Sequence, residues 1–256
     1  QLLEEDLGMR LHNEKRIHKL LANADSVIAI SKTVKEKYEK KLNKKLRLIY
    51  NGIPLETYQI TDKDCFTDDT VNILLAGRIL EQKGQLDAVK AINHLVSMGI
   101  TNVCLTIAGD AEDSSYINKI NDFINVNQLN DYINIIDHVS DLKKLREKND
   151  IGLICSKKEA FGRVTIETMA SQMLTIGANT GGTLEIIEDN INGLLYQQGD
   201  YISLANRIKY AIENRDEMDS IIQNGYKSVL ENYSISRVVD QIMEVYNVEN
   251  STINHM

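Results

Sequence analysis

The sequence has little of several features that would assign it to a specialised class. Its 256 residues include no tryptophan, one proline and three cysteines, and aromatic residues make up 5% of them. No apolar run approaches the roughly 20 residues that a membrane-spanning helix needs, and the first residues are polar rather than signal-like. These absences argue against a membrane or secreted protein, and we expect a cytoplasmic one.

The cysteines show neither the spacing of a metal site nor that of a disulfide framework. Cys65, Cys104 and Cys155 are odd in number, and the last two fall within apolar runs. Such residues are typical of buried, free thiols in a reducing compartment. We therefore expect no disulfide and no metal.

The net charge of −8 is unevenly distributed. Residues 1–50 hold 12 lysines and arginines against 7 acidic residues, whereas the remainder holds 17 against 30. Most of the basic residues of this first part lie between Lys32 and Arg47. A solvated helix face is the more common origin of such a cluster, and peripheral contact with the inner face of a membrane is the alternative. The acidic remainder, with few aromatic residues, argues against nucleic-acid binding.

Short apolar runs alternate with amphipathic segments from residue 71 onward. The runs are Val71–Ala76, Val103–Ala108, Tyr132–Ile136, Ile151–Cys155 and Leu174–Ala178. Repeated alternation predicts an α/β fold with a Rossmann-like parallel sheet flanked by helices on both faces. After Leu195 the pattern predicts helices only.

The first fifth of the chain has a different pattern. A polar helical stretch over residues 2–22 precedes one β-α-β piece, formed by the apolar runs Ser26–Ile30 and Leu46–Tyr50 with the basic segment between them. Such a piece cannot bury both faces of its strands alone. We therefore expect residues 1–52 to be the tail end of a truncated N-terminal domain and residues 53–70, with the single proline at 54, to be a linker. The main domain then spans residues 71–232, and a C-terminal helix and tail span residues 233–256.

Two glutamates surround a Phe-Gly turn directly after the apolar run at residues 151–156. A strand-to-helix junction offers free N–H groups and a helix dipole to an anion. If the helix begins near Gly162, Glu167 lies beside its apolar stripe, and partial burial of a carboxylate is costly without partners. Glu159 and Glu167 can then hold hydroxyl groups on either side of the anion, which describes a nucleotide sugar. An Arg163–Glu167 pair and an exposed Glu159 are the structural alternatives.

Two further glycine-bearing loops follow predicted strands. After residue 76, Gly77 allows close backbone approach, and Arg78 and Lys83 offer positive charge to a diphosphate, although solvated cations are the alternative. After residue 178, Gly181-Gly182-Thr183 opens a helix, and a tight turn with Thr183 as the N-cap is the alternative. Because ligands bind at the carboxyl edge of parallel strands, three such loops favour one shared site.

Together these motifs resemble those of the C-terminal, donor-binding half of family four retaining GT-B glycosyltransferases. The stretches that carry the resemblance run along the whole chain: Ala24–Ser31, Ile49–Ile53, Gly77-Arg78 with Lys83-Gly84, Ile107–Asp110, Glu159–Val164 with Glu167, Gly181–Thr183 with Glu185, Gly193–Tyr196 and Gly199-Asp200.

The resemblance implies an enzyme that transfers a hexose, with retention, from a UDP- or GDP-linked sugar to a glycan or lipid-linked acceptor in surface polysaccharide synthesis. It implies that Arg78 and Lys83 neutralise the leaving diphosphate, that Glu159 binds the donor sugar and that Glu167 binds the ribose. The other donor contacts that it implies are Gly77, Phe161, Gly162, Arg163, Val164 and Thr183, with no metal or other cofactor.

The acceptor site would belong to the N-terminal domain, so this chain alone is expected to be incomplete and inactive. Two alternatives stay open. One is a non-catalytic nucleotide-binding module that needs a partner subunit, and the other is a GT-B-like sugar-nucleotide epimerase.

Overall fold

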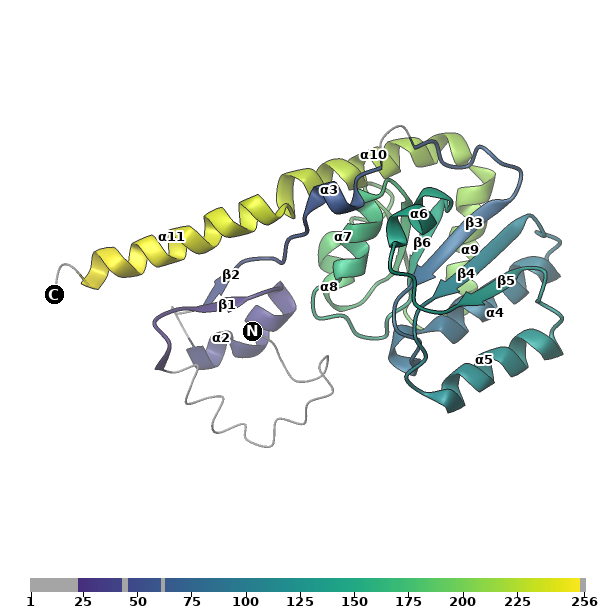
Figure 1. Ribbon diagram of the computed structural model, residues 1–256, viewed down its shortest axis with the longest axis horizontal. Coiled ribbons are helices and arrows are strands. Elements are labelled where there is room, and N and C mark those ends of the chain that lie inside the picture. The colour runs from purple at the N-terminus through teal and green to yellow at the C-terminus, as the bar shows by residue number, and fades with distance from the viewer. Residues whose placement is uncertain (1–22, 43–45, 61–62, 254–256) are drawn as a thin grey trace.

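The computed structural model describes residues 23–42, 46–60 and 63–253, and the polar helix expected at residues 2–22 lies outside them. Its main feature is a six-stranded parallel sheet, shown in Figure 1, with the strand order β5-β4-β3-β6-β7-β8. The strands are β3 (Val71–Ala76), β4 (Val103–Ala108), β5 (Ile133–Ile136), β6 (Ile151–Ile154), β7 (Leu174–Ala178) and β8 (Leu194–Tyr196). The α/β fold with a parallel, Rossmann-like sheet is therefore confirmed.

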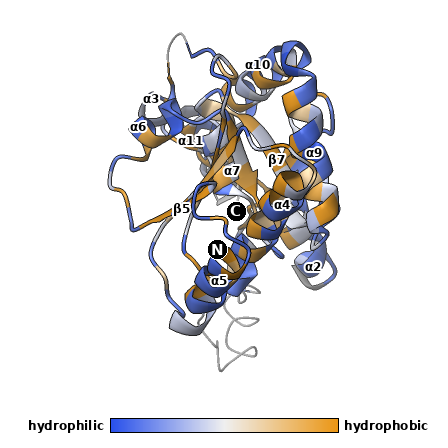
Figure 2. Cartoon of the chain, turned by 90° about the vertical axis from the view of Figure 1, so that its right-hand side faces the viewer, coloured by the Kyte–Doolittle hydropathy of each residue, from blue (hydrophilic) through white to orange (hydrophobic). Residues whose placement is uncertain are grey.

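Helices cover both faces of this sheet. They are α4 (Gln85–Ser97), α5 (Ser114–Val126), α6 (Leu142–Glu147), α7 (Arg163–Ala170), α8 (Gly181–Ile186), α9 (Tyr201–Glu213) and α10 (Arg215–Asn232). Helix α4 packs against α5 and α9 on one face, and α7 packs against α10 on the other. The strands are nearly continuous apolar runs because both of their faces are covered, and Figure 2 shows hydrophobic residues gathered on them and hydrophilic residues along the outer sides of the helices.

Local sequence signals account for where several helices begin. The side chain of Asp113 accepts hydrogen bonds from the amides of Ser115 and Tyr116 at the start of α5, and Asp200 caps α9 in the same way. Such caps satisfy amides that have no partner within the helix. Helix α7 instead follows Gly162, whose φ of 100° lies in the left-handed region. The expectation that this helix begins near Gly162 is confirmed.

The strand predictions were accurate except at the end of the sheet. Three strands have the expected bounds, β5 begins one residue after Tyr132, and β6 ends one residue before Cys155. Strand β8, which pairs with β7 from Leu194 to Tyr196, was not among the expected strands, whereas the expected purely helical part of the described chain follows directly after it. A three-residue strand shows too little periodicity to be recognised from its sequence.

A small two-stranded sheet precedes the main one. It consists of β1 (Val27–Ala29) and β2 (Leu46–Leu48), with α2 (Lys32–Leu42) between them. Glu185 on α8 accepts hydrogen bonds from the amides of Lys32 and Thr33, at 2.7 and 2.8 Å, and so caps α2 from the main sheet's side. The expected division of the chain at residues 52, 70 and 232 stays a prediction.

The segment between the two sheets packs tightly on the main one. It contains the short helix α3 (Leu55–Tyr58), which contacts α7. Ile53 is fully buried, and its amide donates to the carbonyl of Tyr233 at 2.9 Å. The last helix, α11 (Ile235–Ile253), projects away from the main sheet in Figure 1. None of the described helices is both long and apolar enough to cross a membrane.

Candidate functional site

A cleft opens at the centre of the main sheet, where the strand order reverses between β3 and β6. Their recorded pairing is limited to Ile73 with Ile151 and Leu74 with Gly152. The last two residues of each strand line the cleft instead, together with Gly77, Lys83, Ser156, Glu159 and Val164. In open parallel sheets this switch point, at the carboxyl ends of the strands, is where ligands bind.

Lys83 and Glu159 meet across this cleft. The Lys83 Nζ lies 3.0 Å from Glu159 Oε2, and the two side chains are 26% and 16% exposed. Lys83 ends a single 3₁₀ turn over Glu81–Lys83 after β3, and Glu159 lies in the loop after β6. The structure therefore brings together two charged residues that the sequence placed in separate loops.

Gly84 and Gly182 allow these loops to pack closely. Gly84 has a φ of 72°, and a Cβ there would lie 2.1 Å from the carbonyl oxygen of Cys155. A Cβ on Gly182 would lie 2.1 Å from the carbonyl oxygen of Phe161, and the Gly182 amide donates to the Glu159 carbonyl at 2.8 Å. Only glycine tolerates such contacts. The third glycine loop therefore supports the backbone of the second.

The sequence left two structural alternatives for these loops, a tight turn capped by Thr183 and an Arg163–Glu167 pair, and the structure decides them differently. The tight turn capped by Thr183 was wrong: α8 begins at Gly181 with Thr180 as its N-cap residue, and Thr183 lies buried within the helix. The Arg163–Glu167 pair is present, with Nη2 and Oε1 3.4 Å apart. It is one of several contacts that the Glu167 carboxylate makes.

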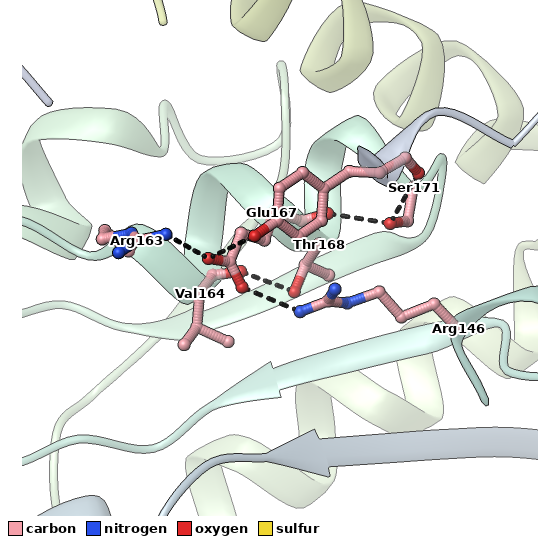
Figure 3. A network of polar contacts seen from close by, with 7 residues as sticks. Arg146, Arg163, Val164, Glu167, Thr168 and Ser171 are labelled. Carbon is pink, nitrogen blue, oxygen red and sulfur yellow. Dashed lines mark hydrogen bonds and ion pairs between the residues drawn. The ribbon is translucent and has the colours of Figure 1, made fainter. Parts of the chain in front are cut away.

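Glu167 is buried beside the cleft, on the same helix as Val164, in agreement with the expected partial burial. Its Oε2 lies 2.9 Å from Nη2 of Arg146, and its Oε1 accepts a hydrogen bond from the Tyr58 hydroxyl at 3.2 Å. Figure 3 shows Arg146 and Arg163 approaching the carboxylate from two sides. Burial, followed by the charge of Glu167, raises the pKa of the Tyr58 hydroxyl.

Arg146 and Tyr58 were missed by the sequence analysis. Arg146 lies on α6 between lysines and a glutamate, which reads as a solvated surface, and Tyr58 lies in the expected linker. Gln85 and Cys155 were also missed as cleft-lining residues. Burial raises the pKa of the Cys155 thiol to about 12.

The other expected site residues lie around the cleft rather than in its lining. Arg78 is exposed and pairs with Glu112, with Nη1 and Oε1 2.8 Å apart. The ring of Phe161 is buried and packs against Tyr50 and Tyr233, at centroid distances of 5.8 and 5.9 Å. Phe161 therefore offers a ligand its backbone only. Gly162 is buried, whereas the Arg163 side chain is 60% exposed.

All three cysteines are free thiols. Within the described ranges, no group of three or more histidines, cysteines and acidic residues is placed to hold a metal ion. Independence from metals stays a prediction.

Comparison with known proteins assigns the family. The chain is 28% identical over 258 residues to an uncharacterized glycosyltransferase, MJ1607, of Methanocaldococcus jannaschii, which covers 94% of this chain and 65% of that protein. It is 26% identical over 237 residues to the capsular polysaccharide biosynthesis glycosyltransferase CapM of Staphylococcus aureus, covering 88% of this chain and 62% of CapM. The chain thus spans less than two thirds of the length of both relatives.

The fold is that of solved glycosyltransferase-like structures. The Anabaena Alr3699/HepE structure in complex with UDP and glucose matches 92% of this chain and 68% of its own, with a TM-score of 0.80 and 22% identity. The family model described as glycosyl transferases group 1 matches residues 60–228, which include the whole cleft. The chain therefore belongs to the group 1 glycosyltransferases.

Proposed function

We propose that the cleft binds a UDP- or GDP-linked sugar, and that the protein transfers a hexose from it, with retention, to a glycan or lipid-linked acceptor in surface polysaccharide synthesis. The observation that carries this proposal is the contact between Lys83 and Glu159 at the switch point of the sheet. A fixed cation and a fixed carboxylate there match the diphosphate and the sugar of such a donor. Family membership and the UDP and glucose bound by Alr3699/HepE support it.

Lys83 is the cation proposed to act on the leaving diphosphate. An ammonium group has three donors, so Lys83 can hold Glu159 and still donate to phosphate oxygens. Charge fixed in a partly buried cleft stabilises the negative charge that develops on a leaving group. Arg78 is proposed to assist, because its exposed pair with Glu112 is weak enough to be exchanged for a phosphate.

The rest of the donor is proposed to follow helix α7. The first N–H groups of a helix have no partner within the helix and are free to bind an anion. Those near Arg163 and Val164 are therefore suited to the phosphates or the sugar. Glu167, further along the same helix, is proposed to accept hydrogen bonds from the ribose hydroxyls. Glu159 would then hold the hydroxyls of the donor sugar.

A second candidate is a nucleotide-binding module that needs another polypeptide for transfer. The observation that favours it is that the residues proposed above to contact the donor all lie on the main sheet's loops and on α7, which together form one cleft region. Donor hydrolysis or transfer by residues 1–256 alone would exclude this candidate. Activity that appears only with a second polypeptide would support it.

Calorimetric titration with UDP, GDP and their hexose conjugates tests donor binding. We expect binding by at least one of them, and weaker binding by Glu167→Ala than by the parent chain. Absence of binding at millimolar concentration would overturn the proposal. Unchanged binding in the presence of EDTA would support metal independence, and the NMR signal of the product's anomeric proton would test retention.

A further inference from the structure

Arg146 occupies an unusual position for an arginine on a short helix. Its side chain is 3% exposed, and within the described residues its Nη2 pairs with Oε2 of Glu167 at 2.9 Å. We propose that Arg146, together with the hydroxyl of Tyr58, positions the Glu167 carboxylate to accept hydrogen bonds from the ribose hydroxyls of a nucleotide. This inference rests on the proposed function, because it assigns a support to the residue that would bind the ribose.

The donors around Glu167 differ in their exposure. Arg146 is buried and Tyr58 is partly buried, and we call these two the interior donors. The Arg163 guanidinium is 60% exposed, and its Nη2 lies at the longer distance of 3.4 Å from Oε1. A carboxylate has about four acceptor positions. Ribose hydroxyls can therefore take the unused position and the one held by Arg163, while the two interior donors keep the carboxylate fixed (Figure 3).

The interior donors are themselves held in place. The Arg146 guanidinium lies over the Tyr58 ring, with 5.2 Å from its Cζ to the ring centroid, and the Tyr58 carbonyl accepts a hydrogen bond from Ser171 at 3.1 Å. The partly buried Lys63 donates to the carbonyls of Arg146 and Asn149 at 2.8 and 2.6 Å, which fixes the end of α6. Side chains held by packing and further hydrogen bonds keep a binding group within a narrow range of positions.

Stability alone does not account for this pair. A buried ion pair is on average no more stabilising than apolar side chains of the same volume, because both charges lose their hydration. A buried arginine beside the cleft is better explained by what it does to the carboxylate. A carboxylate that is already held in its binding position raises the affinity for the ligand, because less side-chain entropy is lost when the ligand binds.

The test compares UDP with 2′,3′-dideoxyuridine 5′-diphosphate by calorimetry, or the matching guanosine pair if the chain prefers GDP. We expect Arg146→Met to weaken UDP binding about tenfold or more and to change dideoxy ligand binding less than about twofold. Arg146→Lys should recover part of the loss because it restores a positive charge. Tyr58→Phe, which keeps the ring, should weaken UDP binding to a smaller extent and also spare the dideoxy ligand.

Arg207→Met is the matched control. The Nη2 of Arg207 pairs with Oδ2 of Asp189 at a distance of 2.6 Å, and neither residue lines the cleft. It should leave the preference for UDP unchanged. Equal losses for both ligands in Arg146→Met would make Arg146 a merely structural residue and overturn the inference, as would a parent chain that binds both ligands equally. If Arg146→Met does not fold, Arg146→Lys and Tyr58→Phe decide. A parent chain that binds neither UDP nor GDP overturns the proposed function as well.

Discussion

Two arginine–glutamate pairs beside the main sheet have nearly the same length and very different surroundings. Arg78 and Glu112 lie 2.8 Å apart with 56% and 49% of their side chains exposed, whereas Arg146 and Glu167 lie 2.9 Å apart with 3% and 12% exposed. Water and salt screen the first pair, and the second lies in a medium where charges interact strongly.

The comparison shows that the distance within an ion pair does not reveal its role. The exposed pair can exchange its partner for a ligand at little cost, which suits Arg78 as a group that engages an incoming diphosphate. The buried pair cannot, because separating it leaves a charge without compensation. It therefore suits a fixed support. The following predictions test that contrast, beginning with the largest expected effect.

Glu167→Ala removes the acid of the buried pair and should destabilise the protein most. The substitution leaves the Arg146 guanidinium buried without its carboxylate and removes the acceptor of the Tyr58 hydroxyl. We expect the free energy of unfolding to fall by about 3 kcal/mol, as for other buried pairs that lose one partner. Urea denaturation of the variant and the parent chain measures it. A loss below about 1 kcal/mol would show that this pair behaves as a surface pair.

Lys83→Met should affect turnover more than stability. We expect kcat to fall about 100-fold, or about 2.7 kcal/mol in activation free energy, with little change in KM, because fixed charge acts mainly on the departing diphosphate. The measurement needs a transfer-competent form of the protein. Lys157→Met is the control, since Lys157 pairs with Glu81 at a similar distance of 2.8 Å but outside the cleft. Equal effects of both variants would contradict the proposed role of Lys83.

Cys155→Ala tests burial at the floor of the cleft. The folded state raises the pKa of this thiol from 9.0 to about 12. Between these two pKa values the folded chain keeps the thiol proton and the unfolded chain has released it. The contribution of the thiol to the free energy of unfolding is therefore complete below pH 9 and is lost as the pH rises towards 12. Between pH 7 and pH 10 the parent chain should lose about 1.4 kcal/mol more stability than Cys155→Ala. Urea denaturation at both pH values measures this difference, and parallel pH profiles would contradict it.

Glu112→Ala should have the smallest effect. Because the Arg78–Glu112 pair is exposed, we expect the free energy of unfolding to change by less than about 0.5 kcal/mol. The same urea denaturation as for Glu167→Ala gives a direct comparison of the two acids. A loss similar to that of Glu167→Ala would remove the distinction between the two pairs.

The sheet was largely predictable from sequence because buried parallel strands are continuous apolar runs. The strands at 71–76, 103–108 and 174–178 have the bounds that their residues indicated. The cleft was predictable as a meeting of the loops after β3 and β6, since parallel strands place their carboxyl ends on one edge, whereas the third glycine loop supports the second and does not line the cleft. The residue roles within it stay predictions.

The partners of the site residues were not predictable in the same way. Arg146 lies 21 residues from Glu167 in the sequence, and Tyr58 lies 109 residues from it. Nothing in the highly charged α6 distinguishes the one arginine that turns inward from its neighbours that face solvent. Burial of a polar side chain depends on a tertiary contact, which local periodicity does not contain.

The reversal of strand order at the cleft has a consequence for how the protein is made. Lys83 and Glu159 are separated by 76 residues, and β3, β4 and β5 all leave the ribosome before β6 does. At about 5–20 residues per second, the chain from the end of β5 to the end of β8 takes about 3–12 s to synthesise, so the first half of the sheet is made several seconds before the second half is complete. A ligand seated between β3 and β6 thus recognises only chains whose two halves have met, and its binding during synthesis would report the completion of the sheet.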